Sequence, residues 1–153
     1  MTEKEALNLA MKLCSKKEYA SGEIRSKLQE WEVDEDLSER IISKLISEKF
    51  IDDQRYSRAF VNDKLKFSKW GKIKIAYMLR QKHVSESIIS EAIENIDPEL
   101  YENILHDELI KKAKTIKAAS DYEFKGKLVQ FASGRGFEYD LAVKLAESFK
   151  RKT

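Results

Sequence analysis

Residues 27–42 read KLQEWEVDEDLSERII and residues 78–93 read MLRQKHVSESIISEAI, and the two stretches share one apolar template. A shift of 51 places the apolar residues of the first stretch on those of the second, and a further shift of 53 places these on a third copy. Three copies of one template with unrelated surface residues indicate an internal repeat. The matched sets are Ile24, Ile75 and Leu128; Leu28, Leu79 and Ala132; Val33, Val84 and Phe137; and Leu37, Ile88 and Leu141.

Each copy predicts one long helix followed by two shorter ones. N-cap residues precede several of these helices: Thr2, Ser21, Asp34, Ser85 and the pair Asp97-Pro98. The expected ranges are 3–15, 21–31 and 34–48; then 52–67, 71–82 and 85–96; then 98–118, 122–133 and 138–151.

The composition agrees with a helical protein, since 37% of the residues are charged and the 153 residues include one proline and five glycines. The chain is therefore predicted to be all-α, with three tandem three-helix repeats that form an elongated, curved body. The predicted repeats are residues 1–50, 51–97 and 98–153.

The same composition excludes several classes. No apolar run approaches the roughly 20 residues that a membrane span needs, and the N-terminus lacks a cleavage-site pattern. The single cysteine fits a reducing cytoplasm. We expect a cytoplasmic monomer that has no membrane contact and needs no cofactor.

The stretch FIDDQRYSRAFV, residues 50–61, begins the second repeat and carries two adjacent aspartates. Such a pair can bind a divalent metal or act in acid/base catalysis. It can also cap a helix, because a carboxylate accepts hydrogen bonds from the free N–H groups of the first turn. No further carboxylate lies at a useful spacing, and His83 and His106 are isolated. We interpret Asp52 and Asp53 as caps of the helix that follows, and expect neither a catalytic nor a metal site.

Two glycine features resemble nucleotide motifs only superficially. The GK pair at residues 71–72 lacks both flanks of a phosphate-binding loop, and SGRGF, residues 133–137, follows a helix rather than a strand. Gly134 and Gly136 are interpreted as helix-ending positions that need positive φ, with Phe137 returning to the core.

The strongest electrostatic feature is the segment 64–85, which contains no acidic residue. A solvated surface, or packing against a neighbouring repeat, would explain it; so would a contact surface for a polyanion or an acidic protein groove. The candidate contact residues are Lys64, Lys66, Lys69, Lys72, Lys74, Tyr77, Arg80 and Lys82. A weaker second patch consists of Lys111, Lys112, Lys114, Lys117, Lys125 and Lys127.

The order and spacing of these motifs resemble the RecX family of bacterial recombination regulators. The family pattern opens its second repeat with a hydrophobic residue, two aspartates and a tyrosine, continues through a Gly-x-x-x-Ile segment, and closes with Arg-Gly-Phe. The matching residues are Ile51, Asp52, Asp53 and Tyr56; Gly71, Ile75, Leu79, Lys82 and Val84; and Arg135, Gly136 and Phe137. Glu32 and His83 stand where the family usually has glycine, so the second helices of the first two copies are expected to end without a glycine cap.

The resemblance implies three three-helix repeats and a regulator that is not an enzyme. It implies binding in the helical groove of the RecA–single-stranded DNA filament, with restraint of the ATPase, strand-exchange and coprotease activities of RecA. Weak direct contact with DNA is compatible with this role. A stand-alone DNA-binding module that uses the basic middle repeat is the alternative.

Overall fold

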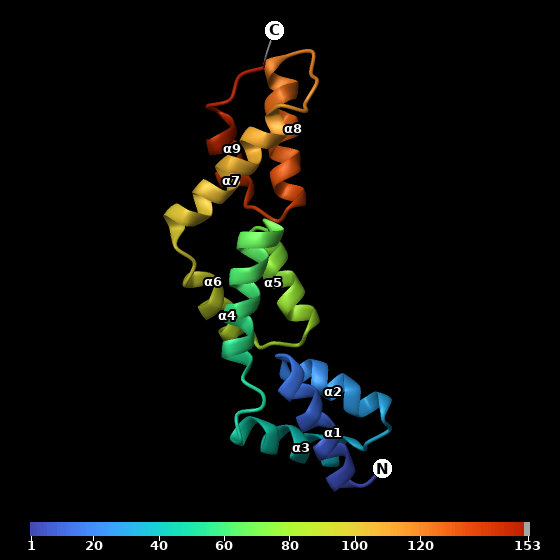
Figure 1. The fold of residues 1–153 in the computed structure, drawn as a ribbon. Coiled ribbons are helices and arrows are strands. Elements are labelled where there is room, and N and C mark those ends of the chain that lie inside the picture. The colour runs from blue at the N-terminus through green and yellow to red at the C-terminus, as the bar shows by residue number, and fades with distance from the viewer. Residues whose placement is uncertain (152–153) are drawn as a thin grey trace. The chain divides into compact units, whose positions relative to one another are not determined.

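The structure, a computed structural model, describes residues 1–151, so residues 152 and 153 of the predicted third repeat lie outside the described residues. Over residues 1–151 the chain is helical and contains no strand (Figure 1), which confirms the all-α prediction. The elements are α1 (Glu3–Lys16), α2 (Ser21–Glu30), α3 (Glu35–Ser47), α4 (Asp53–Asp63), the π-helical turn η1 (Lys64–Ser68), α5 (Lys72–Gln81), α6 (Glu86–Glu94), α7 (Pro98–Ala113), α8 (Asp121–Gly134) and α9 (Tyr139–Ala146).

The chain packs as two compact units. The first unit comprises residues 1–60 and 79–92, and the second comprises residues 61–78 together with the chain from Ile93 onward. Helices α4 and α5 each begin in one unit and end in the other. This division differs from the division into repeats, whose boundaries remain a prediction.

The residues of the apolar template are the buried residues of the second helix in each repeat. The template residues of α2, α5 and α8 are all fully buried: Ile24, Leu28, Ile75, Leu79, Leu128 and Ala132. The turn after each of these helices also repeats, because the N–H of Val33, Val84 or Phe137 donates to the carbonyl of Leu28, Leu79 or Ala132 at 3.0, 3.2 and 3.0 Å respectively. Burial and hydrogen bonding thus follow the shifts of 51 and 53.

The residue at the centre of this turn has a positive φ in all three copies. Glu32 and His83 both have φ of 60°, and Gly136 has φ of 90°. The first two copies therefore do adopt the left-handed cap, with a side chain in place of the glycine that the conformation favours. The interpretation of Gly136 is confirmed, whereas that of Gly134 is wrong, since Gly134 is the last residue of α8 and has no positive φ.

Most predicted caps are present. Thr2, Asp34 and Asp97 accept hydrogen bonds from the N–H groups of Glu5, Leu37 and Glu99, and Pro98 is the first residue of α7. Ser85 precedes α6 as predicted, but its hydroxyl contacts that of Ser87 at 3.3 Å.

Three predicted helices end earlier than expected or change form. The expected helix 52–67 continues past Asp63 as the π-helical turn η1, after which Lys69 takes φ of 58°. The expected helix 98–118 ends at Ala113, because the N–H and the hydroxyl of Thr115 both donate to the Lys112 carbonyl at 2.9 Å and close a turn there. The expected helix 138–151 ends at Ala146.

Candidate partner-binding surface

The paired aspartates of the second repeat accept hydrogen bonds from two different helices. Asp52 caps α4, since its carboxylate accepts from the Arg55 N–H at 3.1 Å. Asp53 does not cap its own helix: its two carboxylate oxygens accept from the N–H and the hydroxyl of Ser21, at 2.7 and 2.6 Å. The prediction is therefore correct for Asp52 and wrong for Asp53. Within residues 1–151 no group of three or more His, Cys, Asp or Glu residues is arranged to hold a metal.

Asp53 is needed at this place because the N-cap of α2 has no acceptor. Ser21, predicted as the N-cap, is the first helical residue, and Ala20 occupies the N-cap position. Glu23 accepts from the Ala20 N–H at 2.9 Å, and Asp53 supplies the second acceptor from another repeat. The free N–H groups of α2 are thus satisfied partly by tertiary contact.

The start of α2 also meets the turn that ends α5, and we call this contact the first junction. A Cβ added to Gly22 would lie 2.3 Å from the Lys82 carbonyl oxygen and 2.7 Å from the His83 Cβ, so only glycine allows this approach. The Lys82 ammonium pairs with the Glu23 carboxylate at 3.0 Å. Two side-chain carboxylates and one lysine therefore hold the first junction.

The ionisable groups at the first junction are mutually stabilised. Burial alone would raise the pKa of Glu23, but the hydrogen bond from the Ala20 N–H and the contact with Lys82 outweigh it and lower that pKa. Burial alone would lower the pKa of Lys82, but the hydrogen bond to Glu23 outweighs burial, so this pKa is raised. Burial followed by the negative charge of Glu23 raises the pKa of Tyr56.

The start of α5 meets the turn that ends α8 in the same way, and we call this contact the second junction. The N–H groups of Gly71 and Ile73 donate to the carbonyls of Arg135 and Gly136 at 2.8 and 3.0 Å. A Cβ added to Gly71 would lie 2.4 Å from Gly136 backbone atoms, and one added to Gly136 would lie 2.3 Å from the Lys74 Cβ. The second junction is therefore held mainly by main-chain groups at very close range.

Tyr101 completes the second junction from α7. Its hydroxyl accepts from the Lys72 N–H at 2.9 Å and donates to the Glu138 carboxylate, and the ring packs on Phe137 with the centroids 5.3 Å apart. Burial, followed by the hydrogen bond to Glu138, raises the pKa of Tyr101, so the hydroxyl keeps its proton.

The eight predicted contact residues of the middle repeat fall into two groups. The segment from Lys64 to Tyr77 belongs to the second unit, whereas Arg80 and Lys82 belong to the first. Arg80 pairs with Glu86 at 2.5 Å; this hydrogen bond raises the pKa of Arg80 and lowers that of Glu86. Lys82 pairs with Glu23, so Arg80 and Lys82 each already have a carboxylate partner.

The segment 64–77, called the basic segment below, combines cations with exposed apolar side chains. Phe67, Ile73 and Tyr77 are 77, 57 and 56% exposed, respectively. Ile73 and Tyr77 are one helical turn apart on α5, opposite the buried Ile75, as the helical periodicity predicted. The main chain of this part of α5 and the Lys72 side chain contact the third repeat, at Arg135, Gly136 and the Tyr101 ring.

Sequence reasoning overlooked Phe67 and Trp70 as members of this surface. The ammonium groups of Lys64 and Lys74 lie 5.0 and 4.5 Å from the centre of the Trp70 ring, and that of Lys72 lies 4.6 Å from the Tyr101 ring. The signal was present in the sequence, because KLKFSKW (64–70) interleaves aromatic residues with lysines.

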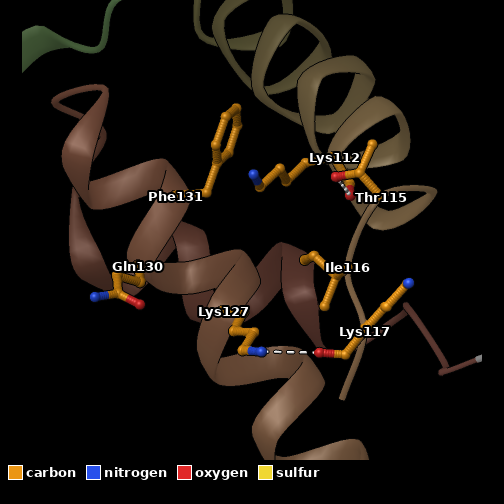
Figure 2. A pocket seen from close by; sticks show the side chains of 7 residues that line it. All are labelled: Lys112, Thr115, Ile116, Lys117, Lys127, Gln130 and Phe131. Atoms are coloured by element: carbon orange, nitrogen blue, oxygen red, sulfur yellow. Dashed lines mark hydrogen bonds between the residues drawn. The ribbon is translucent and has the colours of Figure 1, made fainter.

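The second predicted patch is partly assembled by the structure. Lys112, Lys117 and Lys127 line one hollow of about 540 Å³ with Thr115, Ile116, Gln130 and Phe131 (Figure 2). In this hollow the Lys127 ammonium donates to the Lys117 carbonyl at 2.8 Å, and the Lys112 ammonium lies 5.4 Å from the Phe131 ring centre.

Nearby carboxylates reduce the charge of this patch. Lys111, Lys125 and Lys127 pair with Glu108, Glu147 and Glu123 at 3.3, 3.3 and 3.2 Å. Lys114 lines a neighbouring hollow beside Phe124 and Phe149. The second patch is thus less basic than its sequence suggests.

In the part of the chain that the structure describes, no helix is both long and apolar enough to cross a membrane.

The repeated core, the repeated turn and the two junctions define a tandem helical-repeat protein. The sequence matches three family models in order along the chain: the first three-helix domain of RecX at residues 6–45, the second at 52–93 and the third at 100–145. The chain belongs to the RecX family.

Curated relatives agree with this assignment. The Regulatory protein RecX of Clostridium botulinum (strain Eklund 17B / Type B) is 34% identical over 149 residues, which cover 92% of this chain and 68% of the relative. That of Chlorobium phaeobacteroides (strain BS1) is 31% identical over 136 residues, which cover 89% of this chain and 87% of the relative. The match to the protein from Leuconostoc mesenteroides, at 29% identity, covers 90% of this chain and 52% of the relative, so the chain spans about half the length of that protein.

Two crystal structures share the fold. RecX from Lactobacillus salivarius aligns with a TM-score of 0.88 and 23% identity over 95% of this chain and 94% of that one. A second structure, of a regulatory protein RecX, aligns with a TM-score of 0.87 and 23% identity over 95% of this chain and 73% of that one.

Proposed function

We propose that this chain is a regulator of RecA that binds the groove of the RecA–single-stranded DNA filament in the cytoplasm and inhibits it. On this proposal it acts by binding, without catalysing a reaction, and lowers the ATPase, strand-exchange and coprotease activities of RecA. The observation that carries the proposal is the ordered match of all three RecX domains along one chain. The name Regulatory protein RecX of its relatives supports a regulatory role.

The basic segment supports an anionic partner. Between Lys64 and Ser85 the sequence has no acidic residue, and in the second unit the exposed Lys66 lies beside the exposed Phe67. Lysines on such a surface accelerate association with a negatively charged assembly and make the affinity depend on salt.

The test is the DNA-dependent ATPase of RecA, measured as the protein is titrated onto filaments assembled on single-stranded DNA. We expect inhibition at well below one molecule per RecA protomer. An ATPase rate that is unchanged at equimolar protein would contradict the proposal.

A charge-reversal pair tests the surface. Lys66→Glu with Lys74→Glu should weaken inhibition about tenfold or more. Neither side chain is buried, but Lys74→Glu also removes the contact with the Trp70 ring, so the melting temperature is measured alongside and should change only slightly. Lys4→Glu with Lys12→Glu, two exposed lysines of α1, changes the net charge equally and should leave inhibition unchanged. Equal loss in both pairs would show that net charge, rather than this surface, is responsible.

A stand-alone DNA-binding module is the second candidate, favoured by the acid-free basic segment. A salt titration separates the two functions. A DNA-binding module should bind single-stranded DNA alone, with affinity falling steeply as salt rises. A filament regulator should bind the filament much more tightly than the free DNA at the same salt concentration.

A further inference from the structure

Phe67 lies where the chain departs from regular helix. It is in the π-helical turn Lys64–Ser68, and Lys69, which follows, takes φ of 58°. A positive φ is unfavourable for a non-glycine residue such as Lys69, and π-helical turns are rare but frequent at functional sites. The turn nevertheless leaves the Phe67 ring 77% exposed, so the distortion does not serve to bury it.

The turn that carries Phe67 is firmly anchored. The N–H groups of Lys69 and Trp70 both donate to the Lys64 carbonyl, and Leu65 is buried with 3% of its surface exposed. The next residue, Gly71, is fixed by its hydrogen bond to the Arg135 carbonyl. An exposed aromatic side chain on a preorganised support is the arrangement typical of an interface anchor.

The apolar side chains of the basic segment favour a protein partner over a nucleic acid. Base stacking needs an open aromatic face; two lysine ammonium groups lie 4.5 and 5.0 Å from the Trp70 ring centre, whereas Phe67 and Tyr77 are exposed, so the residue that discriminates is the aliphatic one. Ile73, 57% exposed, has no π face to offer a base. Apolar anchors among lysines instead complement an apolar pocket with a carboxylate rim.

We propose that Phe67, supported by Ile73 and Tyr77, docks into an apolar pocket rimmed by acidic residues on the protein subunits of the filament. This inference rests on the proposed function and assigns the basic segment to the protein component rather than to the DNA. The lysines orient the approach, and the buried ring supplies most of the affinity.

Three variants at position 67 test the inference: Phe67→Ala, Phe67→Leu and Phe67→Tyr. Binding is measured by fluorescence anisotropy of labelled protein on RecA filaments and, separately, on the same single-stranded DNA without RecA. We expect Phe67→Ala to raise the filament Kd about tenfold or more, while Phe67→Leu stays close to the wild type because an apolar pocket accepts either side chain. Binding to free DNA should not change.

The matched control is Tyr122→Ala, which removes an aromatic ring that is 91% exposed on α8 and lies outside the basic segment. Its filament Kd should equal that of the wild type, and all variants should keep the wild-type melting temperature because both side chains are exposed. Loss of binding by Phe67→Leu and Phe67→Ala, with retention by Phe67→Tyr and a parallel loss on free DNA, would assign the ring to base stacking and overturn the inference.

The outcome also separates the inference from the proposed function. If the wild type binds and inhibits filaments and Phe67→Ala does so equally well, the inference alone fails. If the wild type neither binds nor inhibits filaments, the proposed function fails and the inference fails with it.

Discussion

The two junctions place equivalent parts of the repeat in contact but hold them with different chemistry. At the first junction, side-chain carboxylates of Asp53 and Glu23 satisfy the start of α2, and Lys82 adds an ion pair. At the second junction, main-chain carbonyls and the Tyr101 hydroxyl satisfy the start of α5. A duplicated contact can therefore keep its geometry while its hydrogen-bond acceptors change from ionisable groups to neutral ones.

The two junctions also differ in where their glycines lie. The first junction has one glycine, at residue 22 of α2, and a histidine in the left-handed turn, whereas the second has glycine on both sides, Gly71 before α5 and Gly136 in the turn. Close approach of two backbones requires that Cβ be absent, and the second junction meets this requirement on both sides while the first meets it on one.

The largest expected effect is at Gly136. Gly136→Ala should destabilise the protein by about 3 kcal/mol, since it adds a Cβ at positive φ and 2.3 Å from the Lys74 Cβ. Urea unfolding followed by circular dichroism measures the change. Gly126→Ala is the control: its Cβ would meet nothing within 4 Å, so the better helix former should stabilise α8 by roughly 0.5–1 kcal/mol. A neutral Gly136→Ala would contradict the close approach at the second junction.

Removal of the Tyr101 hydroxyl comes next. Tyr101→Phe keeps the packing on Phe137 but leaves the Lys72 N–H and the Glu138 carboxylate without this partner, at a cost of about 1–3 kcal/mol. The same unfolding experiment applies. Tyr122→Phe, at an exposed ring, should change the free energy of unfolding very little. Equal stability of Tyr101→Phe and wild type would show that water replaces the hydroxyl and that the contact contributes nothing.

The third prediction concerns pH and separates the junctions most directly. The pKa of Glu23 is lowered in the folded chain, so its stabilisation is present above the unfolded value of about 4.3 and is lost as pH falls through the folded pKa. The pKa of Lys82 is raised, so its stabilisation is complete below about 10.4 and is lost only as pH rises through the higher folded pKa.

Glu23→Gln should therefore cost on the order of 1 kcal/mol at neutral pH and a progressively smaller amount as the pH falls below about 4.3. Urea titrations at several pH values measure this difference. Gly136→Ala provides the contrast, because its cost comes from positive φ and from the close approach to Lys74 rather than from a titrating group, so it should stay nearly constant over the same range. A Glu23→Gln cost that did not change with pH would mean that the ion pair is not a stabilising element.

The smallest expected effect is a gain. His83→Gly should stabilise the protein by roughly 0.5–1 kcal/mol, because His83 is exposed and has φ of 60°, which glycine adopts without strain. Glu32→Gly, with the same φ in the first repeat, should give a similar gain. Thermal melting of both variants is the measurement, and a loss at His83 alone would reveal a packing contribution of its ring at the first junction.

The fold could be predicted from the sequence because its signals are local and repeated. The apolar template identified the buried residues of α2, α5 and α8, and the caps at Thr2 and Asp34 are formed by hydrogen bonds that span three residues. The end of α7 was missed because Lys and Ala continue the helical pattern through residue 118, whereas the turn at Thr115 competes with it.

The features that decide the junctions could not be predicted in this way. Asp53 resembles any first-turn carboxylate, and its bond to Ser21 spans 32 residues of sequence. His83 lacks the glycine that usually marks a left-handed turn, because the turn is closed by main-chain hydrogen bonds, from the His83 and Val84 N–H groups to the Arg80 and Leu79 carbonyls, that leave no mark in the residue types. At the candidate site, the lysines were visible as a run, but the exposure of Phe67 depends on a π-helical turn that no residue pattern marked.

The reach of Asp53 and Lys82 into the first repeat has a practical consequence for dissecting the chain. A fragment that stops at residue 50 contains α1, α2 and α3 but lacks both side chains that complete the start of α2. Its apolar core would lose only Ile51 of the buried cluster, yet the first turn of α2 would fray, and protease cleavage should begin there, near Ala20 and Ser21. Expression of single repeats will therefore underestimate how well each one is ordered within the whole protein.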